Sequence, residues 1–303
     1  MSGNLSGVLL LNKPSGITSH DVVSRIRKIF QTRQVGHTGT LDPMATGVLP
    51  ILVGNAVKAS EYLTADSKTY KAGMRLGIET DTEDTSGMTI RECSDIPSDE
   101  EIEKAVLSFL GEYRQIPPMY SAVKIGGEKL YEKARRGETV EREARLVRVE
   151  KIECRKLSDT EWEIVTTVSK GTYIRTLISD IGKKLSCGAA MSSLERTASG
   201  DFTIDLCHTL EALETASDLT SFLLPVSELF SELSEIRLPE FYERLAKNGA
   251  EIYFSRAKIT PLPEGERVRM IDKNGDFFAL GEVRLFEKGL AIKPIKFFRG
   301  LEL

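Results

Sequence analysis

The sequence has few of the residues that build metal sites and disulfide frameworks. Its 303 residues include three histidines and four cysteines, and no two cysteines form a C-x-x-C pair. A structural zinc site needs several such ligands at short, regular spacings, so we expect no metal site. Widely separated cysteines are also typical of proteins in a reducing compartment, and we therefore predict a cytoplasmic protein.

Long apolar runs are missing as well. The longest begins at Gly7 and ends at Leu11, whereas a transmembrane helix needs about 20 apolar residues. The first four residues carry no basic side chain, so we expect neither a membrane span nor a secretory signal. With 41% hydrophobic residues, the composition is that of a globular protein, and the length predicts two domains or one domain with an appendage.

The sequence also has no excess of basic residues. The net charge is -4, from 41 Lys and Arg against 45 Asp and Glu, and this average disfavours a protein that binds nucleic acid. However, residues 201–235 contain eight acidic residues and no Lys or Arg. The remainder therefore has 41 basic and 37 acidic residues, a net charge of +4. This modest positive charge is compatible with a protein that binds one folded RNA and recognises it mainly by its shape.

Four segments have strand patterns. Residues 7–11 and 48–53 are apolar runs, which is typical of strands buried on both faces. Two other segments alternate in polarity, which is typical of strands with one buried face. Their inward positions are Tyr70, Ala72, Met74 and Leu76 in the first segment, and Trp162, Ile164, Thr166 and Val168 in the second.

Three helices are predicted among these strands. Thr18 and Asp21 form a capping-box pattern before the apolar stripe of the first helix. A second capping box precedes a helix that we expect to carry Phe109 and to stop at Gly111. A third apolar stripe starts at Ile174. Because strands and helices do not alternate regularly, we predict an α+β fold rather than a doubly wound sheet.

We place the α+β body at residues 1–235. Two regions have a different pattern: one is a segment within this body, and the other follows it. Residues 117–148 are rich in Lys and Arg and lack apolar periodicity, so we interpret them as an insertion. Residues 236–303 predict a small β domain with a hairpin around Asn274-Gly275. Because Asn-Gly favours the positive φ angles of a tight primed turn, we expect that turn in the hairpin.

Asp42 is the most interesting candidate for a catalytic group. Its loop contains three glycines, which permit tight backbone paths and the close approach of a ligand. Pro43 biases the backbone of Asp42 away from helical angles and so fixes the direction of the carboxylate. Such a carboxylate can act as a nucleophile at a glycosidic carbon or an electrophilic ring. An ordinary Asp-Pro turn is the competing interpretation, which the pattern alone favours.

Five other residues are weaker candidates. Arg175 near a carboxylate would keep it ionised, although a solvated position in the first helical turn fits equally well. Tyr70 and Tyr173 have faces that can stack on an extruded base, but alternating aromatics more often belong to a core. His37 can contact a phosphate or a base, yet one loop histidine is weak evidence. Leu194 by itself indicates only an apolar environment.

The insertion indicates a ligand class. It interleaves basic residues with tyrosines, a composition that suits a phosphate backbone with unstacked bases. A solvated surface lobe is the alternative, because five glutamates dilute the positive charge. The residues concerned are Lys124, Lys129, Lys133, Arg135, Arg136, Arg142, Arg145, Arg148, Tyr120 and Tyr131. Patterns alone thus indicate an α+β protein that binds RNA, and they indicate no reaction.

A resemblance to a known family predicts a reaction. The segment Gly36-His-Thr-Gly-Thr-Leu-Asp-Pro-Met-Ala-Thr-Gly-Val-Leu-Pro50 resembles the catalytic-aspartate box of the TruB family, the bacterial tRNA pseudouridine-55 synthases. Five further boxes of that family occur in the expected order. They are Asn12-Lys-Pro-Ser-Gly-Ile-Thr-Ser19, Lys68-Thr-Tyr-Lys71, Pro117-Pro-Met-Tyr-Ser-Ala-Val-Lys124, Leu130-Tyr-Glu-Lys-Ala-Arg-Arg-Gly137 and Gly171-Thr-Tyr-Ile-Arg175. Residues 236–303 are more loosely similar to the PUA domain, a small RNA-binding β barrel.

The resemblance implies a pseudouridine synthase fold, which is a mixed, largely antiparallel sheet flanked by helices. It implies that the insertion clamps the T-arm of tRNA. The implied reaction isomerises uridine to pseudouridine at position 55 of the T-loop, by base flipping and aspartate-assisted cleavage of the glycosidic bond, without a cofactor. Asp42 corresponds to the catalytic aspartate, Arg175 to its arginine partner, and Tyr70 to the tyrosine that stacks on the base. His37, Tyr173 and Leu194 correspond to positions that line the RNA or the flipped uridine.

Two mechanistic points stay open at this stage. The reaction passes through either a glycal or a covalent adduct with Asp42. The final proton goes to Tyr70, to water or to Asp42. Tyrosine, whose usual pKa is about 10, is a poor base unless its surroundings lower that value.

The sequence departs from the family at Ala190 and Glu195, which stand where His and Arg are usual. We expect these changes to weaken RNA affinity or its salt dependence rather than activity. We expect a monomer without an obligate protein partner or guide RNA, because guide-directed relatives lack the basic clamp. An RNA-binding or folding-assistance protein without chemistry is the alternative, and it would not need Asp42, Tyr70 and Arg175.

Overall fold

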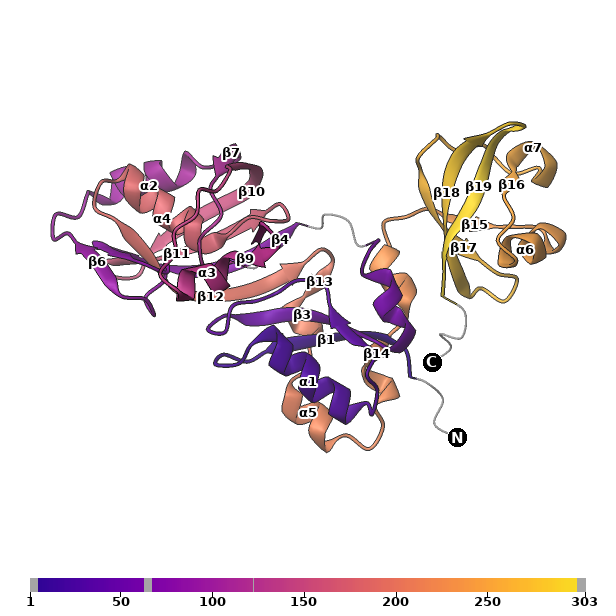
Figure 1. The fold of residues 1–303 in the computed structure, drawn as a ribbon, viewed down its shortest axis with the longest axis horizontal. Coiled ribbons are helices and arrows are strands. Elements are labelled where there is room, and N and C mark those ends of the chain that lie inside the picture. Colours follow the sequence, from indigo (N-terminus) through magenta and orange to yellow (C-terminus); the bar gives the residue numbers. More distant parts are fainter. Residues whose placement is uncertain (1–4, 63–66, 122, 299–303) are drawn as a thin grey trace.

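Two β-sheet bodies form the molecule (Figure 1), in a computed structural model that describes residues 5–62, 67–121 and 123–298. The larger body is a ten-stranded sheet in the order β14-β1-β3-β12-β4-β11-β10-β7, with β2 beside β3 and β13 beside β12. Its strands are β1 (Gly7–Lys13), β2 (Val35–His37), β3 (Thr46–Val53), β4 (Lys68–Leu76), β7 (Gly111–Gln115), β10 (Arg145–Lys156), β11 (Glu161–Val168), β12 (Ala189–Ser199), β13 (Phe202–Thr203) and β14 (Leu223–Leu224). All four predicted strands are present, and the sheet is almost entirely antiparallel, as expected.

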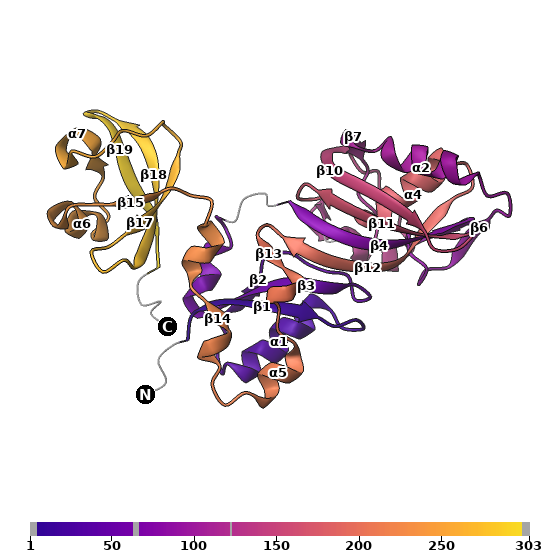
Figure 2. The same ribbon diagram turned by 180° about the vertical axis from the view of Figure 1, so that it is seen from behind.

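One parallel contact joins the two halves of this sheet. β3 and β12 pair through only two positions, Thr46 with Glu195 and Gly47 with Arg196. On one side lie β14, β1, β3 and β2, and on the other β12, β4, β11, β10 and β7. We call this contact the sheet junction. Figure 2 shows the two halves meeting there from the opposite side.

Helices and 3₁₀ turns cover the sheet, and β1 and β3 are buried on both faces. The helices are α1 (Ser19–Ile29), α2 (Asp99–Leu107), α4 (Ile174–Lys184) and α5 (Leu210–Thr215), with the 3₁₀ turns η1 (Gly54–Ala59), η2 (Ile204–Leu206), η3 (Thr220–Phe222) and η4 (Val226–Phe230). Both predicted capping boxes are formed. The prediction that the second helix reaches Gly111 was wrong, because α2 ends at Leu107 and Phe109 lies in the turn that follows. In the described residues, the helices are too short or too polar to cross a membrane.

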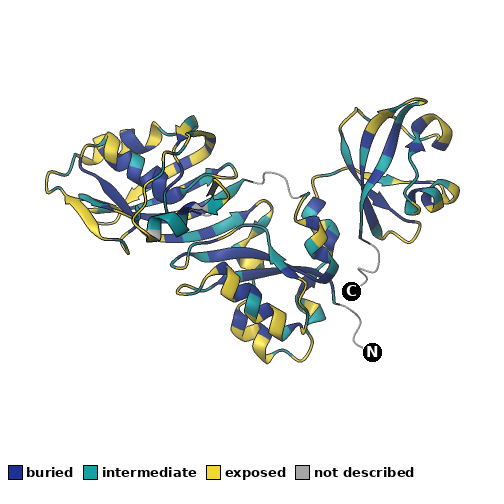
Figure 3. Ribbon diagram, viewed as in Figure 1, coloured by how far each residue is buried: buried dark blue, intermediate teal, exposed yellow. Residues whose placement is uncertain are grey.

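The core of the larger body lies between these helices and the sheet. Val22 and Ile26 of α1, Leu177 of α4, and Trp162 of β11 are buried. Figure 3 shows the dark, buried strands in the centre and exposed positions on the outer sides of the helices. The alternating patterns are confirmed, since the inward positions of β4 and β11 are all buried.

Two smaller elements project from the larger sheet. A hairpin of β5 (Ile78–Thr80) and β6 (Thr89–Glu92) follows β4. The predicted insertion leaves the sheet after Gln115 and contains β8 (Lys124–Ile125), β9 (Glu128–Lys129) and α3 (Leu130–Arg135). Its expected end at residue 148 falls inside β10, because Arg145 already pairs with Gln115 of β7.

The C-terminal module is a second, curled sheet in the order β15-β17-β18-β19-β16. Its elements are β15 (Glu235–Arg237), α6 (Glu240–Lys247), β16 (Ile252–Tyr253), α7 (Phe254–Ala257), β17 (Arg267–Ile271), β18 (Phe277–Phe286) and β19 (Gly289–Phe297). It shares a buried cluster with the larger sheet, in which Leu280 and Phe298 pack with Val8 and Phe230. The shared core fixes this module against β1 and η4.

The predicted hairpin is present, but the expected turn was wrong. Among the described turn residues only Gly275 has a positive φ, +95°. The carboxylate of Asp272 accepts hydrogen bonds from the backbone N–H groups of Asn274 (2.9 Å) and Asp276 (3.1 Å). This side chain stabilises a longer loop between β17 and β18, so a two-residue primed turn is not needed.

Candidate active site

Asp42 lies in the loop between β2 and β3, at the sheet junction. The hydroxyl of Ser19 accepts a hydrogen bond from the backbone N–H of Leu41 (2.9 Å) and donates one to its carbonyl (3.1 Å). On the other side of Asp42, the ammonium of Lys13 donates to the carbonyl of Pro43 (3.2 Å). The backbone is thus pinned on both sides, whereas the carboxylate itself is 35% exposed. These side-chain contacts on both sides of Asp42 distinguish the loop from an ordinary Asp-Pro turn.

Arg175 meets this carboxylate from the first turn of α4. Its Nε lies 2.9 Å from Asp42 Oδ2, and its Nη2 donates to Oδ1 at 3.3 Å. Only 6% of the Arg175 side chain is exposed, which excludes the solvated position considered above. A two-pronged contact of this kind fixes the orientation of a carboxylate. The structure therefore brings together the aspartate and the arginine that the sequence proposed.

Three further groups fix the guanidinium of Arg175. Nη1 donates to the carbonyl of Thr82 (3.1 Å) and Nη2 to the carbonyl of Tyr120 (2.9 Å). The carboxylate of Asp84 lies 3.7 Å from Nη1 and is 8% exposed. Arg175 thus connects Asp42 with the β5–β6 hairpin and with the base of the insertion.

Asp84 is a functional candidate that the sequence analysis missed. Its Oδ1 accepts hydrogen bonds from the hydroxyl of Thr82 (2.9 Å) and the backbone N–H of Ser86 (3.0 Å). The neighbouring Glu83 has a φ of +63°, and its carboxylate accepts a bond from Thr176 Oγ1 (2.6 Å). No local pattern marks this loop, because its contacts with α4 arise only when the chain folds back.

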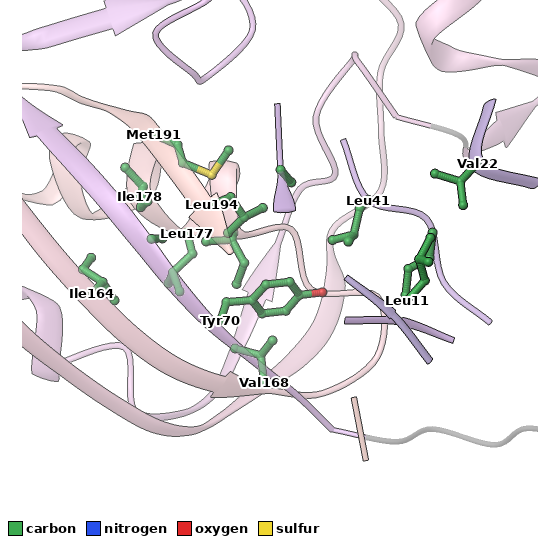
Figure 4. Close-up of a cluster of buried hydrophobic side chains, with 14 of the residues drawn as sticks. Leu11, Val22, Leu41, Tyr70, Ile164, Val168, Leu177, Ile178, Met191 and Leu194 are labelled. Atoms are coloured by element: carbon green, nitrogen blue, oxygen red, sulfur yellow. The ribbon is translucent and has the colours of Figure 1, made fainter. Parts of the chain in front are cut away.

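Tyr70 lies on β4, between Arg196 of β12 and Thr166 of β11. It is 8% exposed and belongs to the main core. Figure 4 shows its ring between Leu194 and Val168, with the hydroxyl directed toward the side where Leu41 lies. Burial raises the pKa of Tyr70, and the hydrogen bond and charge of Arg196 offset this only in part. Tyr70 is therefore a neutral phenol near pH 7.

His37 and Tyr173 lie at the ends of elements that lead to the site. The Nδ1 of His37 accepts a hydrogen bond from the N–H of Gly39 (3.2 Å). Burial and then the charge of Arg196 lower the pKa of His37, so its ring is neutral and its remaining N–H is on Nε2. Tyr173 precedes α4, where its N–H and carbonyl bond the side-chain amide of Gln115 at 2.8 and 3.0 Å. These bonds fix the start of the helix that carries Arg175.

The two departures from the family pattern lie on β12. Ala190 is completely buried, and the effect of this change on RNA affinity stays a prediction. Glu195 is half-buried and pairs with Lys71 and Thr46 in the strand register. The adjacent Arg196 is 1% exposed and reaches the Asp42 loop.

Comparisons with known proteins identify the family of the chain. A model of the TruB family pseudouridylate synthase N-terminal domain matches residues 27–174, and one of the tRNA pseudouridylate synthase B C-terminal domain matches residues 175–231. The protein called tRNA pseudouridine synthase B in Bacillus subtilis is 42% identical, covering 96% of this chain and 97% of its own. That of Alkaliphilus oremlandii is 48% identical over 82% of this chain and 83% of its own.

Solved structures confirm the predicted fold class. A chain in a Cbf5-Nop10-Gar1 complex has a TM-score of 0.75 at 27% identity, covering 97% of this chain and 85% of its own. A chain in an archaeal box H/ACA Nop10-Cbf5 complex has a TM-score of 0.72 at 24% identity, over 99% of this chain and 88% of its own. With relatives above 40% identity along nearly the whole chain and a matching pair of family models, the protein belongs to the TruB family of pseudouridylate synthases.

Proposed function

We propose that this protein isomerises uridine to pseudouridine at position 55 in the T-loop of tRNA. Its relatives are tRNA pseudouridine synthases. The observation that carries the proposal is the Asp42–Arg175 pair, in which a buried guanidinium presents a partly exposed carboxylate. A pure RNA-binding protein has no use for an anion held in this way.

Asp42 supplies the reactive group. Its carboxylate assists cleavage of the bond between N1 of the base and C1′ of the ribose, where positive charge develops on the sugar. Arg175 orients the carboxylate through its two contacts with it. The contacts of Arg175 with Thr82 and Tyr120 prevent the guanidinium from turning away. Fixed charges of this kind need no reorganisation at the moment of reaction.

The target uridine has to leave the T-loop before it reaches Asp42. Extrusion of a base costs a few kcal/mol, which stacking and polar contacts offset. Tyr70 and Leu194 form the apolar wall on the side of β4 and β12. His37 and Tyr173 lie on the elements that flank the site, and we assign them to the RNA-facing rim.

The isomerisation conserves atoms within the nucleoside. The N1–C1′ bond breaks, the uracil turns, and a C5–C1′ bond forms; C5 then loses a proton, and N1 gains one. A buried neutral phenol is a poor acceptor for the C5 proton, because the pKa of Tyr70 is raised by burial. Asp42 or a water molecule is thus favoured as the acceptor, and Tyr70 acts as a surface for the base.

We propose that the insertion binds the T-arm of the tRNA. We also propose that the C-terminal module, residues 236–303, is a PUA-like domain that contacts RNA. Arg145 and Arg148 on β10 are exposed at the base of the insertion. Within the insertion, Arg136 is bound by Glu128 and Glu138, which reduces its free charge. We further propose a cytoplasmic monomer that needs no cofactor, protein partner or guide RNA.

A guide-directed synthase is the second candidate, favoured by the likeness to chains in Nop10 and Gar1 complexes. The relatives named tRNA pseudouridine synthase B are more similar in sequence, at 48% and 42% identity against 27%, and the insertion supplies a basic surface of its own. Turnover on free tRNA without other components distinguishes the two candidates.

The test uses the purified full-length chain and an unmodified tRNA transcript labelled with tritium at uracil C5. We expect tritium release and pseudouridine at position 55 alone. A transcript with cytidine at that position should release no tritium from the T-loop. A folded protein that leaves intact wild-type tRNA unmodified would overturn the proposal. A requirement for added protein or RNA would support the second candidate.

A further inference from the structure

The sheet junction separates the two sides of the proposed site. The Asp42 loop belongs to the half that contains β1, β2 and β3, whereas Tyr70 belongs to the half that contains β12 and β4. The backbone pairing between these halves covers only two positions. Side chains that cross the junction therefore matter for the distance between Asp42 and Tyr70.

Arg196 crosses the junction. It projects from β12, where its backbone pairs with Tyr70 on one side and Gly47 on the other. Its Nε donates to the carbonyl of Val48 (2.7 Å) and its Nη2 to the carbonyl of Gly39 (3.2 Å). Its positive charge also acts on the hydroxyl of Tyr70, where it opposes the rise in pKa that burial causes. One guanidinium thus contacts the Asp42 loop at Gly39 and the following strand β3 at Val48, while the backbone of Arg196 lies beside Tyr70.

Burial makes this arrangement specific. Arg196 is 1% exposed and is among the largest fully buried side chains. A buried guanidinium is costly unless its N–H groups are satisfied, so the position of each acceptor constrains the others. The acceptors of these hydrogen bonds are two backbone carbonyls, one in the Asp42 loop and one in β3. The planar fork of arginine can reach both, whereas the single ammonium of lysine cannot reproduce the fork.

Gly39 shows how closely the loop approaches Arg196. A Cβ at this position would lie 3.3 Å from Arg196 Nη1, which is tighter than ordinary contact. Gly39 also donates its N–H to His37 Nδ1. An alanine at residue 39 would press on the guanidinium without removing any of its hydrogen-bonding groups.

We propose that Arg196 is a positioning residue for the isomerisation: its guanidinium holds the Asp42 loop at a fixed distance from Tyr70 across the sheet junction. The inference rests on the proposed function. It assigns Arg196 no contact with the reacting atoms. Because a displacement of about 1 Å can lower a rate by about 100-fold, loss of the guanidinium acts on the chemical step.

The experiment compares Arg196→Lys and Arg196→Gln with the wild type. Single-turnover tritium release at saturating enzyme reports the chemical step, filter binding reports tRNA affinity, and thermal melting reports folding. We expect the single-turnover rate to fall about 100-fold in both variants, with tRNA dissociation constants within threefold of the wild type. Arg155→Gln is the matched control, because Arg155 is 70% exposed and pairs with Glu163 at the surface; its rate should stay within twofold.

A merely structural role predicts a different result. It lowers the melting temperature and the folded fraction but leaves the rate per folded molecule within threefold of the wild type, and that outcome overturns the inference. Gly39→Ala covers the case in which both Arg196 variants fail to fold. We expect this milder change to lower the single-turnover rate about tenfold at unchanged tRNA affinity, and a rate within twofold overturns the inference.

The proposed function and this inference fail in distinguishable ways. A folded wild-type protein without pseudouridine formation overturns the proposed function, and the inference with it. An active wild type with fully active Arg196 variants overturns only the inference.

Discussion

Asp42 and Asp84 share one guanidinium. Arg175 contacts Asp42 through Nε and Nη2, while Asp84 lies 3.7 Å from Nη1 on the other side. The two carboxylates differ in access, since 35% of the Asp42 side chain is exposed and only 8% of that of Asp84. One carboxylate can therefore meet a substrate, and the other can only hold the arginine.

This difference predicts unequal effects for two isosteric substitutions. Asp42→Asn removes the anion at the reacting centre, so we expect single-turnover tritium release to fall by at least about 1,000-fold. Asp84→Asn leaves Asp42 in place and weakens only the support of Arg175, so we expect a loss of about tenfold. Both variants should bind tRNA within a few-fold of the wild type. Equal losses in the two variants would contradict the distinction.

Much of this fold was predictable because its signals are local. Apolar alternation identified β4 and β11, and the capping boxes identified α1 and α2. In contrast, β14 consists of Leu223 and Leu224 alone and pairs with Leu9 and Val8, more than two hundred positions earlier. Two residues carry no periodicity, so only the folded chain reveals this edge strand.

The site was predictable where a family box contained it. Asp42 and Arg175 lie in such boxes, and the structure brings them together. Asp84 and Arg196 could not be predicted from the sequence, for physical reasons. Asp84 acts through a loop that folds back onto α4. Arg196 lies on β12, where bulges after Met191 and Arg196 interrupt the alternation that would have marked an inward side chain.

Lys13 gives the site a pH dependence. Its ammonium is completely buried and donates to the carbonyls of Pro14 (2.8 Å), Ile17 (2.7 Å) and Pro43 (3.2 Å). Burial lowers the pKa of Lys13 to about 8, although the charges of Asp42 and Asp21 oppose the change. The folded-state pKa lies below that of unfolded lysine. Lys13 therefore makes the free energy of unfolding increase as the pH is raised through the interval between about 8 and about 10.5.

Activity should change in the opposite direction over this range. Above pH 8 the ammonium loses its charge, and its bonds to the backbone beside Asp42 weaken. We expect the single-turnover rate of the wild type, divided by that of Lys13→Met, to fall as the pH rises from 7 to 9.5. The ratio cancels any ionisation of the RNA. A ratio that stays constant over this range would show that Lys13 does not tune the loop.

The exposed arginines of β10 predict a salt-dependent contribution to tRNA binding. Arg145 and Arg148 are exposed, whereas Arg136 is held by two glutamates. Each free cation that meets a phosphate adds about one unit to the slope of log affinity against log salt. We expect Arg145→Ala and Arg148→Ala each to reduce that slope by about one unit, and Arg136→Ala to change it little.

Filter binding between 50 and 300 mM salt measures these slopes. The single-turnover rate at saturating enzyme should be unchanged in all three variants, because none of these side chains contacts Asp42 or Arg175 in the structure. A larger slope change in Arg136→Ala than in the other two would contradict the prediction that Arg145 and Arg148, rather than the paired Arg136, supply the free charge that meets the RNA.

Two glycines of the Asp42 region predict stability effects of unequal size. Gly47 has a φ of +103°, and a Cβ there would lie 2.2 Å from the carbonyl oxygen of Arg196. Gly36 has ordinary backbone angles, and its Cβ would lie 3.8 Å from Val57. We expect Gly47→Ala to lower the free energy of unfolding by about 3 kcal/mol, since backbone strain adds to a clash at the sheet junction. Gly36→Ala should change it by less than about 1 kcal/mol. Urea unfolding of the two variants measures both values, and equal destabilisation would show that the close approach of β3 and β12 at Gly47 is not what requires glycine.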